Sequence, residues 1–435
     1  MNYATLPNLL ALSILVSVFW AISRKNTGYQ VQVWLVGWAL ILLHFVAGAP
    51  AVRNPVAVRL ATALSLDCLF LASVTFVISV SAIATSRRRQ IELAVAIGLP
   101  CLAYSHGQIW EISSPVYYYV LLVIGPLAPL TLFLRYSKKS QLYKSGGVVA
   151  TLAVTAAAAA GVVRGNPGLG ITVLLASLNL AAAFMYWNQY KRTSAGVLTT
   201  VAGFLFWGAV FPTSLLLEVF VPLAKIESEV WNIPKYLVAV GMILTLLEDQ
   251  IARSTYLAYH DALTELPNRR LLDDRLDQAI VYAARNRSKI AVFVLDLDHF
   301  KEVNDSFGHR FGDATLRKVV ERLSSRIRAS DTLARSGGDE FTVLSHVSSS
   351  DGAEVLLQGL ESALEEPIFV EGKEVQTGVS IGVAVYPDDG QTADELHAAA
   401  DRAMYVAKTR RPQFQVLHVV EDCILLAHGT RLTNR

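Results

Sequence analysis

The residues whose types could do chemistry stand together at 335–341, which read Arg-Ser-Gly-Gly-Asp-Glu-Phe. Alternating apolar residues flank them at 332–335 and 341–344, which predicts a β-hairpin with an acidic tip. The two glycines are expected to supply the positive φ angles of a tight turn and to leave room for a ligand beside the backbone. Neighbouring carboxylates repel each other, and a divalent cation with phosphate would compensate them. A solvated acidic turn is the alternative interpretation.

A third carboxylate follows a buried strand upstream of this hairpin. Residues 290–295 are a continuous apolar run bounded by polar residues, which predicts a strand buried on both faces. Asp296 comes directly after it, where a carboxylate is poorly placed for stability and well placed to hold a metal. Short polar residues and glycines typical of a ligand-lining loop and a helix start follow: Asn304, Asp305, Gly308, His309, Gly312 and Asp313. The acids at 296, 339 and 340 are therefore expected to converge on one groove.

These stretches resemble, in order, the GGDEF family of diguanylate cyclases. The resemblance runs from about Asp261 to Val416 and rests on five motifs. They are Asp261-Ala262-Leu263-Thr264 with Leu266-Pro267-Asn268-Arg269, the segment from Asp296-Leu297-Asp298 to Asp313, the Gly-Gly-Asp-Glu-Phe hairpin, Ser380-Ile381-Gly382-Val383-Ala384 with Pro387, and Ala400-Asp401 with Met404-Tyr405 and Ala407-Lys408. Glu265 departs from the family, which often has glycine at that position.

The alternation of elements predicts an α/β domain with a mostly antiparallel central sheet. The expected elements are helices at 271–285, 314–328, 353–363 and 393–408, strands at 290–295, 368–370, 377–385 and 414–419, and the hairpin at 332–345. The resemblance implies the palm-like fold of nucleotide cyclases and polymerases. The predicted fold class is therefore an α-helical polytopic membrane domain followed by an α/β GGDEF domain.

The reaction that the resemblance implies joins two GTP molecules into cyclic di-GMP and releases two pyrophosphates. Each half is an in-line attack of a ribose 3′-hydroxyl on an α-phosphate. One active site holds one GTP, so two domains must face each other, which predicts a homodimer. Nucleic acid is not an expected partner.

The resemblance also implies roles for individual residues. The catalytic and metal-binding set is Asp296, Asp339 and Glu340 with the backbone carbonyl of Leu297, holding two Mg²⁺ ions. The substrate-binding set is Asn304 and Asp313 for guanine, and His299, Phe300, Lys301 and Lys408, of which the two lysines contact phosphate. Asp313 argues for GTP, because a carboxylate accepts from the N1–H and N2 amino group of guanine.

Two further positions carry alternatives. Arg328 and Asp331 match the family's inhibitory Arg-x-x-Asp site, which binds product, and a helix-end ion pair is the other interpretation. After Lys408 the chain reads Thr-Arg-Arg-Pro-Gln where the family has x-x-Gly-Arg-Asn. Either Arg410 or Arg411 would replace the missing arginine.

The composition excludes an ordinary soluble protein. The 435 residues are 53% hydrophobic and 17% charged, with a mean hydropathy of +0.41. Long apolar runs end near residue 248, and several reach the roughly 20 residues that cross about 30 Å of hydrocarbon. Nine spans are predicted, with eight as the neighbouring count: 6–22, 31–49, 58–84, 91–105, 116–134, 147–163, 168–187, 197–220 and 233–247. The predicted domains are a multi-span sensory domain (1–248), a connecting helix (249–262), a cyclase domain (263–419) and a tail (420–435).

The placement of basic residues predicts the orientation of these spans. With the N-terminus outside, the inner loops hold eleven Lys and Arg and the outer loops five, as the positive-inside rule requires. The cyclase domain would then lie in the cytoplasm of a bacterial cell, attached to the inner membrane and close to GTP. The first apolar run lacks a basic start and a cleavage site, which indicates a retained membrane helix. The three cysteines show no metal-ligand or disulfide spacing.

Polar residues inside the spans are candidates for a sensing function. Asp67, His44 and His106 could bind a metal or respond to protons, and polar groups satisfied between packed helices are the alternative. The signal itself is not identified by any motif. A helical seam leaves the last span and predicts pairing across a dimer: Leu244, Leu247, Ile251, Ser254 and Ala258.

Two other functions compete with the cyclase. A degenerate domain could bind cyclic di-GMP at Arg328 and Asp331 without making it, although the intact hairpin and Asp296 argue against this. A transporter with a regulatory domain would show repeats and broken helices around midplane polar residues. Pro126 and Pro129 could break a helix, but no convincing repeat is present.

Overall fold

The computed structural model describes residues 6–25, 28–48, 54–81, 84, 86–137, 139–220 and 230–410. The chain divides into two compact units, residues 1–250 and 251–435. Four features predicted from the sequence lie outside the described residues: the strand at 414–419, the tail at 420–435, Arg411 and Cys423.

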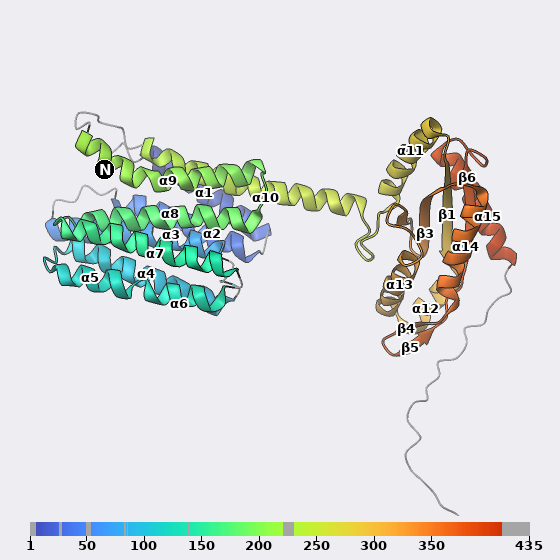
Figure 1. Ribbon diagram of the computed structural model, residues 1–435, viewed down its shortest axis with the longest axis horizontal. Helices are drawn as coiled ribbons and strands as arrows, with labels where there is room; N and C mark the ends of the chain where they lie inside the picture. The colour runs from blue at the N-terminus through green and yellow to red at the C-terminus, as the bar shows by residue number, and fades with distance from the viewer. Residues whose placement is uncertain are drawn as a thin grey trace, which may run out of the picture. The chain divides into compact units, whose positions relative to one another are not determined.

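The first unit is a bundle of long helices (Figure 1). In the described residues they are α1 (Leu6–Lys25), α2 (Tyr29–Gly48), α3 (Pro55–Ser79), α4 (Arg87–Ile109), α5 (Pro115–Ile124), α6 (Leu127–Tyr136), α7 (Gln141–Val163), α8 (Gly168–Tyr190), α9 (Ala195–Phe220) and α10 (Ile233–Tyr259), with the 3-10 helix η2 (Val230–Asn232) before α10. Within these residues, eight segments are long and apolar enough to cross a membrane, α5 and α6 being counted together. The length and composition of these helices therefore fit a membrane-spanning bundle.

Helix α4 accounts for the difference between eight spans and nine. The span expected at 91–105 belongs to a continuous helix of 23 residues, which is less apolar than the others because three arginines begin it and polar residues such as Gln90 and Glu92 follow. The helix nevertheless contacts α3, α5, α6 and α8, so it lies within the bundle. The span expected at 233–247 is part of α10, which continues without a break to Tyr259.

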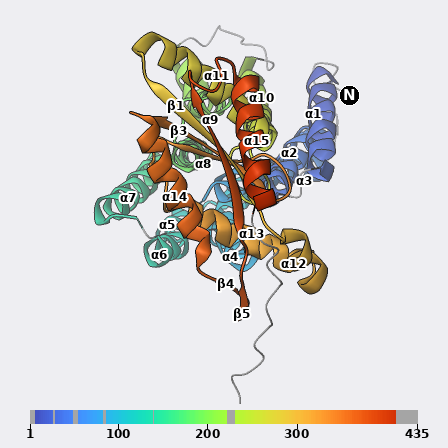
Figure 2. The same ribbon diagram turned by 90° about the vertical axis from the view of Figure 1, so that its right-hand side faces the viewer.

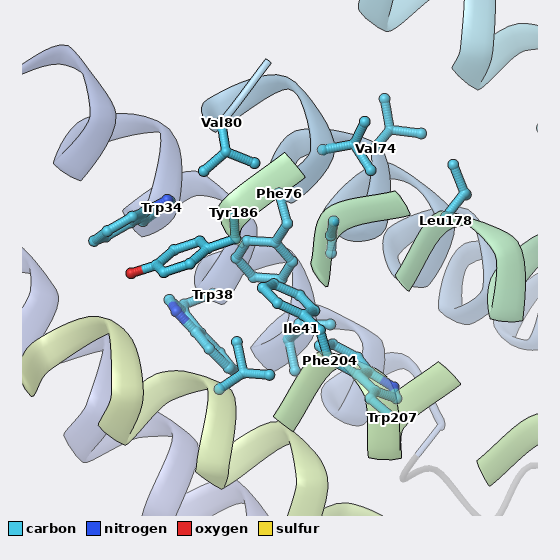
Figure 3. Packing of buried hydrophobic residues seen from close by; sticks show 14 of the residues in the cluster. Trp34, Trp38, Ile41, Val74, Phe76, Val80, Leu178, Tyr186, Phe204 and Trp207 are labelled. Atoms are coloured by element: carbon cyan, nitrogen blue, oxygen red, sulfur yellow. The ribbon is translucent and has the colours of Figure 1, made fainter. Parts of the chain in front are cut away.

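Large aromatic rings fill the centre of this bundle. Figure 3 shows Trp34 and Trp38 of α2, Phe76 of α3, Tyr186 of α8, and Phe204 and Trp207 of α9, all fully buried. The Phe76 ring centroid lies 5.3 Å from that of Trp38 and 5.8 Å from that of Phe204. Gly37 makes this packing possible, because a Cβ there would lie 2.6 Å from Cε1 of Phe76. Tilted aromatic contacts each add about 0.5–1.5 kcal/mol to the burial of area.

The second unit is built on a four-stranded sheet in the order β2-β3-β1-β6. Its strands are β1 (Lys289–Leu297), β2 (Thr332–Arg335), β3 (Glu340–Val347) and β6 (Val379–Tyr386), and every neighbouring pair is antiparallel. A separate hairpin joins β4 (Ile368–Val370) to β5 (Lys373–Val375). The antiparallel α/β sheet predicted from the sequence is confirmed.

Strand β1 is central because its side chains are apolar on both faces. Phe293 and Leu295 point into one core with α12 (Phe300–Phe307), α13 (His309–Ser324) and α14 (Ser350–Glu365). Val292 and Val294 point into the other core with α11 (Arg269–Asn286) and α15 (Ala393–Arg410). The prediction of a strand buried on both faces is confirmed.

The segment after β1 differs from the expectation of a loop. Residues 300–307 form helix α12, and α13 begins at His309 rather than at 314. Gly308, with φ of 84°, separates the two helices in a conformation that favours glycine. The β4–β5 hairpin lies beside α12 at one end of the sheet, where Nζ of Lys373 is 4.9 Å from the ring centroid of Phe307 (Figures 1 and 2).

Gly382 of β6 packs directly against the backbone of α15. A Cβ at Gly382 would overlap the backbone of Ala400 and Met404. Gly382→Ala is therefore expected to force α15 away from the sheet and to lower the free energy of unfolding by about 1–3 kcal/mol. Urea unfolding of a fragment beginning at residue 251 measures this change.

Gly359→Ala is the matched control for that substitution. Gly359 lies within α14 and has no atom within 4 Å of its Cβ position. Alanine there is expected to stabilise the helix by about 0.5–1 kcal/mol. Equal effects of the two substitutions would contradict the proposed contact between Gly382 and α15.

Candidate active site

The end of β1 brings three segments of the second unit together. In the sheet register, Asp296 lies opposite Glu340 of β3 and opposite Ser380 of β6. The backbone N–H of Leu297 donates to the carbonyl of Asp339 at 3.3 Å, and that of Asp298 donates to the carbonyl of Gly378 at 2.9 Å. Backbone pairing therefore places the acidic hairpin tip beside the carboxyl end of the buried strand.

Asp296 forms an ion pair with a residue far along the chain. Nζ of Lys408 on α15 lies 2.5 Å from Oδ1 of Asp296. Only 11% of the Asp296 side chain is exposed, and burial raises the pKa of its carboxyl group. The hydrogen bond from Lys408 opposes this rise, whereas the charges of Asp339 and Asp298 add to it. The same hydrogen bond raises the pKa of Lys408, so the ammonium stays charged.

Asp298 holds the neighbouring strand in place. Its Oδ1 accepts a hydrogen bond of 2.7 Å from Oγ of the fully buried Ser380. Gly378 lies directly beside it, because a Cβ at 378 would be 2.6 Å from Oδ2 of Asp298. Asp298 and Ser380 both belong to motifs recognised in the sequence, but only their contact shows that they act on each other.

The hairpin glycines correct one expectation. Neither Gly337 nor Gly338 has a positive φ. Among the described residues, the glycines with a positive φ are Gly165, Gly308 and Gly372. Gly337 lies close to the Glu340 carboxylate, since a Cβ there would be 3.0 Å from Oε2 of Glu340. The position of Gly338 is open, with no atom within 4 Å of a Cβ. The hairpin therefore leaves room beside its acidic tip without a left-handed turn.

Arg335 fastens the hairpin to the start of the second unit. Its Nη1 lies 2.8 Å from Oδ1 of Asp261, and its Nε and Nη2 donate to the carbonyl of Gly338 at 3.1 and 2.6 Å. Asp261 also accepts from Thr264 through the backbone N–H and the hydroxyl. Burial raises the pKa of Asp261, but the hydrogen bonds from Thr264 and Arg335 outweigh it and leave this pKa below its usual value. Neither the type nor the sequence position of these two residues reveals this contact.

The acidic side chains do not yet form a metal-ligand cluster. Among the described residues, no three Asp, Glu, His or Cys side chains are grouped closely enough to hold an ion. The Glu340 side chain turns toward Gly337, and Asp296 contacts an ammonium group. The donor chemistry still fits magnesium, because Asp296, Asp339 and Glu340 offer hard carboxylate oxygens and Lys408 already places a cation against Asp296.

The predicted guanine-binding residues lie on consecutive helices. Asn304 is on α12 and Asp313, which is exposed, is on the first turns of α13. Gly312 brings them together, since a Cβ at 312 would overlap the Asn304 side chain. The two residues therefore occupy one corner of the domain.

The other predicted substrate contacts differ in exposure. Lys301 is exposed, and Nδ1 of His299 lies 2.8 Å from Oε1 of Glu302. Phe300 is only 7% exposed and belongs to the core beneath α12 and α13. Phe300 therefore packs in the core under α12 and α13 and supports the helices that carry Asn304 and Asp313.

The Arg-x-x-Asp residues form a compact turn before β2. The backbone N–H of Arg328 donates to Oδ2 of Asp331 at 2.9 Å, and Oγ of Ser345 donates to Oδ1 at 3.0 Å. Asp331 thus stabilises the turn through both carboxylate oxygens. The Arg328 residue is exposed beside it.

The burial of Asp296 predicts a pH-dependent cost to the fold. Because its folded pKa is raised, the folded chain binds this proton more tightly than the unfolded chain, and stability falls as pH rises through the interval between the two values. Asp296→Asn is expected to raise the free energy of unfolding at pH 7, and the gain should vanish below about pH 4, where the wild-type group is protonated too. Urea unfolding at both pH values measures this.

Asp305→Asn on the exposed surface of α12 is the control for charge removal. It should change stability little at either pH. A loss of stability in Asp296→Asn at pH 7 would show instead that the ion pair with Lys408 stabilises the fold on balance.

Known proteins resemble the second unit. The bifunctional diguanylate cyclase/cyclic di-GMP phosphodiesterase MucR of Pseudomonas aeruginosa is 43% identical over 186 residues, which are 39% of this chain and 27% of MucR. Diguanylate cyclase TpbB of the same species is 40% identical over 164 residues, which are 37% of this chain and 38% of TpbB. The chain thus spans well under half the length of these relatives.

Solved structures match the same region. A sensory box/GGDEF family protein from Caulobacter crescentus is 44% identical, and the match covers 35% of this chain and 98% of that one with a TM-score of 0.34. The GGDEF domain of TpbB is 40% identical, covering 35% of this chain and 90% of that one with a TM-score of 0.34. The family described as "Diguanylate cyclase, GGDEF domain" matches residues 258–413. Residues 258–413 of this chain are therefore a GGDEF domain.

Proposed function

We propose that the chain is a membrane-bound diguanylate cyclase that condenses two GTP molecules into cyclic di-GMP and two pyrophosphates. The observation that carries this proposal is the cross-strand pairing of Asp296 with Glu340 beside Asp339. Relatives that share the domain include proteins named diguanylate cyclases. The basic inner loops support a cytoplasmic position for the domain, where GTP is available.

The acidic residues would hold two magnesium ions. Asp296, Asp339, Glu340 and the carbonyl of Leu297 are the proposed ligands. Bound magnesium would neutralise triphosphate charge and lower the pKa of the ribose 3′-hydroxyl. Without a bound metal, Lys408 neutralises Asp296. The Lys408 side chain is 46% exposed, so it has room to turn toward a phosphate.

The helices after β1 would select and place the nucleotide. The exposed carboxylate of Asp313 would accept from the guanine N1–H and amino group, and the amide of Asn304 would donate and accept beside it. Lys301, exposed at the start of α12, would contact phosphate. These groups hold one GTP, so the attacking hydroxyl must come from a second domain.

The homodimer would form through the helix that leaves the bundle as well as through the GGDEF domain. Leu247 and Ile251 of the predicted seam are 51% and 65% exposed on α10. Large apolar side chains repeating at helical spacing favour pairing with a second copy. Such pairing would face two cyclase domains toward each other.

The membrane unit would control the cyclase through α10. Three contacts join α10 to α8, to the α8–α9 connection and to α9: Tyr186 to Thr245 at 3.0 Å, Arg192 to Asp249 at 2.7 Å, and the Gly196 N–H to Glu248 at 2.9 Å. Beyond α10, the Asp261–Arg335–Gly338 contacts lead to the acidic hairpin. A change in the bundle that moves α10 would thus reach the active site and the dimer pose.

Removing the hairpin acids tests the activity. The purified full chain with GTP and magnesium is expected to form cyclic di-GMP, identified by mass, whereas the Asp339→Ala, Glu340→Ala variant should lose at least about 100-fold in rate. Asp274→Ala, Asp277→Ala removes two exposed acids from α11 and should leave the rate unchanged. Tight binding of cyclic di-GMP without any turnover would favour a receptor instead.

Product inhibition at Arg328 and Asp331 is the second testable part of the proposal. Arg328→Ala removes a guanidinium that would contact guanine and phosphate but leaves the backbone bond to Asp331 in place. The initial rate should stay unchanged, and product should accumulate further before turnover stops. An unchanged progress curve in the variant would show that the turn has only a structural role.

A further inference from the structure

The membrane unit contains an apolar cavity of about 770 Å³. Helices α3 to α8 line it with aliphatic and aromatic side chains, among them Leu93, Ile97, Leu121, Leu130, Phe133 and Leu178. No Asp, Glu, Lys, Arg or His occurs among the described residues of its lining. The volume falls in the range of about 300–1,000 Å³ typical of small-molecule sites.

Three hydroxyl groups along the wall already donate hydrogen bonds to backbone carbonyls. Thr151 donates to the carbonyl of Gly147 at 2.8 Å, Ser177 to that of Leu174 at 2.8 Å, and Tyr104 to that of Pro167 at 2.9 Å. A polar ligand that entered the cavity would lose its hydrogen bonds to water, and these hydroxyl groups would not replace them because they already donate to the backbone. The interior therefore suits a hydrocarbon, which fills the space with favourable van der Waals contacts.

The sequence of the surrounding helices keeps this space open. On one side, Gly125 separates α5 from α6. A Cβ at this position would lie 2.8 Å from Cβ of Pro100, so α4 already contacts the break between α5 and α6. On the other side, α7 presents Gly146, Gly147 and Ala150 to the cavity, which are too small to fill it. The cavity thus lies where the break between α5 and α6 faces the small residues of α7.

Basic residues occur on the helix ends that lie next to one end of the cavity. The short connections α3–α4 and α6–α7 lie at this end, and Phe133 and Tyr143 of its lining are 5.8 Å apart there. The guanidinium carbons of Arg89 and Arg135 lie 4.4 and 5.5 Å from the ring centroid of Tyr136. Lys144 follows Tyr143 directly. This end therefore attracts an anionic group.

We propose that the cavity binds one acyl chain of an anionic phospholipid, with the phosphate lying among Arg89, Arg135 and Lys144. An apolar interior next to a cationic rim matches a molecule with a hydrocarbon chain and a charged head. The bilayer supplies such molecules from the side, because α5, α6 and α7 carry exposed apolar residues around the cavity. Helix α8 lines the cavity through Phe184 and Met185, next to Tyr186, which bonds α10.

Photolabelling of the full chain tests this site. The protein is placed in phosphatidylcholine nanodiscs with traces of phosphatidylglycerol, phosphatidylcholine or palmitic acid, each carrying a diazirine at the end of its acyl chain. Phosphatidylglycerol is expected to label cavity-lining residues of α5 to α8 at one site per chain. Labelling spread over all lipid-facing helices would overturn the proposal, as would equal labelling by phosphatidylcholine or labelling by palmitic acid alone.

Two sets of variants separate the chain site from the head-group site. Ala150→Phe with Ala181→Phe fills the cavity and should lower its labelling roughly tenfold or more, whereas Val149→Phe, at an exposed position outside the lining, should not. Arg135→Gln with Lys144→Gln leaves the cavity intact and should abolish the preference for phosphatidylglycerol. Unchanged labelling in both sets overturns the proposal. The readout does not depend on GTP turnover.

Discussion

The carboxylate of Asp296 stands at the end of a strand that is buried on both faces, and the second unit is arranged around this constraint. A charge with so little exposure needs a nearby cation, and α15 supplies Lys408 at 2.5 Å. Because α15 packs on β6 through Gly382, the same helix stabilises the sheet and neutralises the site. A magnesium ion bound to Asp296 would have to displace the ammonium group of Lys408. The ion pair and the proposed metal site therefore share the carboxylate of Asp296.

The hairpin depends on contacts at its base more than on its turn. Arg335 joins the carbonyl of Gly338 to Asp261 at the start of the unit, so the acidic tip is held from the side on which the helix from the membrane ends. Within the sheet, Glu340 and Ser380 hold Asp296 between two antiparallel strands. The hairpin is thus attached to the central strand β1 by backbone pairing, and the ion pair between Arg335 and Asp261 connects it to the segment that precedes α11.

The membrane unit combines tight and open packing. Around Phe76, aromatic rings from four helices contact one another, and Gly37 allows the closest approach (Figure 3). Around α5 to α7, helix breaks and small residues leave a cavity instead. The two regions share α8, which bonds α10 through Tyr186. Helix α8 therefore connects the packed core, the cavity and α10.

The amino-acid sequence determined the features that depend on local pattern. The apolar run before Asp296 predicts β1 and its burial, the lengths of the apolar segments predict the bundle, and the ordered motifs identify the GGDEF domain. These inferences succeed because hydropathy and periodicity act over neighbouring residues. The roles of the site residues stay predictions, since geometry alone does not test them.

Tertiary structure alone decided which distant groups meet. Lys408 and Asp296 are 112 residues apart, and Asp261 and Arg335 are 74 apart, so no local pattern announces either contact. Gly337 lies close to the Glu340 carboxylate and has no positive φ, whereas Gly308 has the positive φ that separates α12 from α13. The physical reason is that the space and charge around a residue are set by chain segments that packing brings together, whereas sequence patterns report only each segment's own preference.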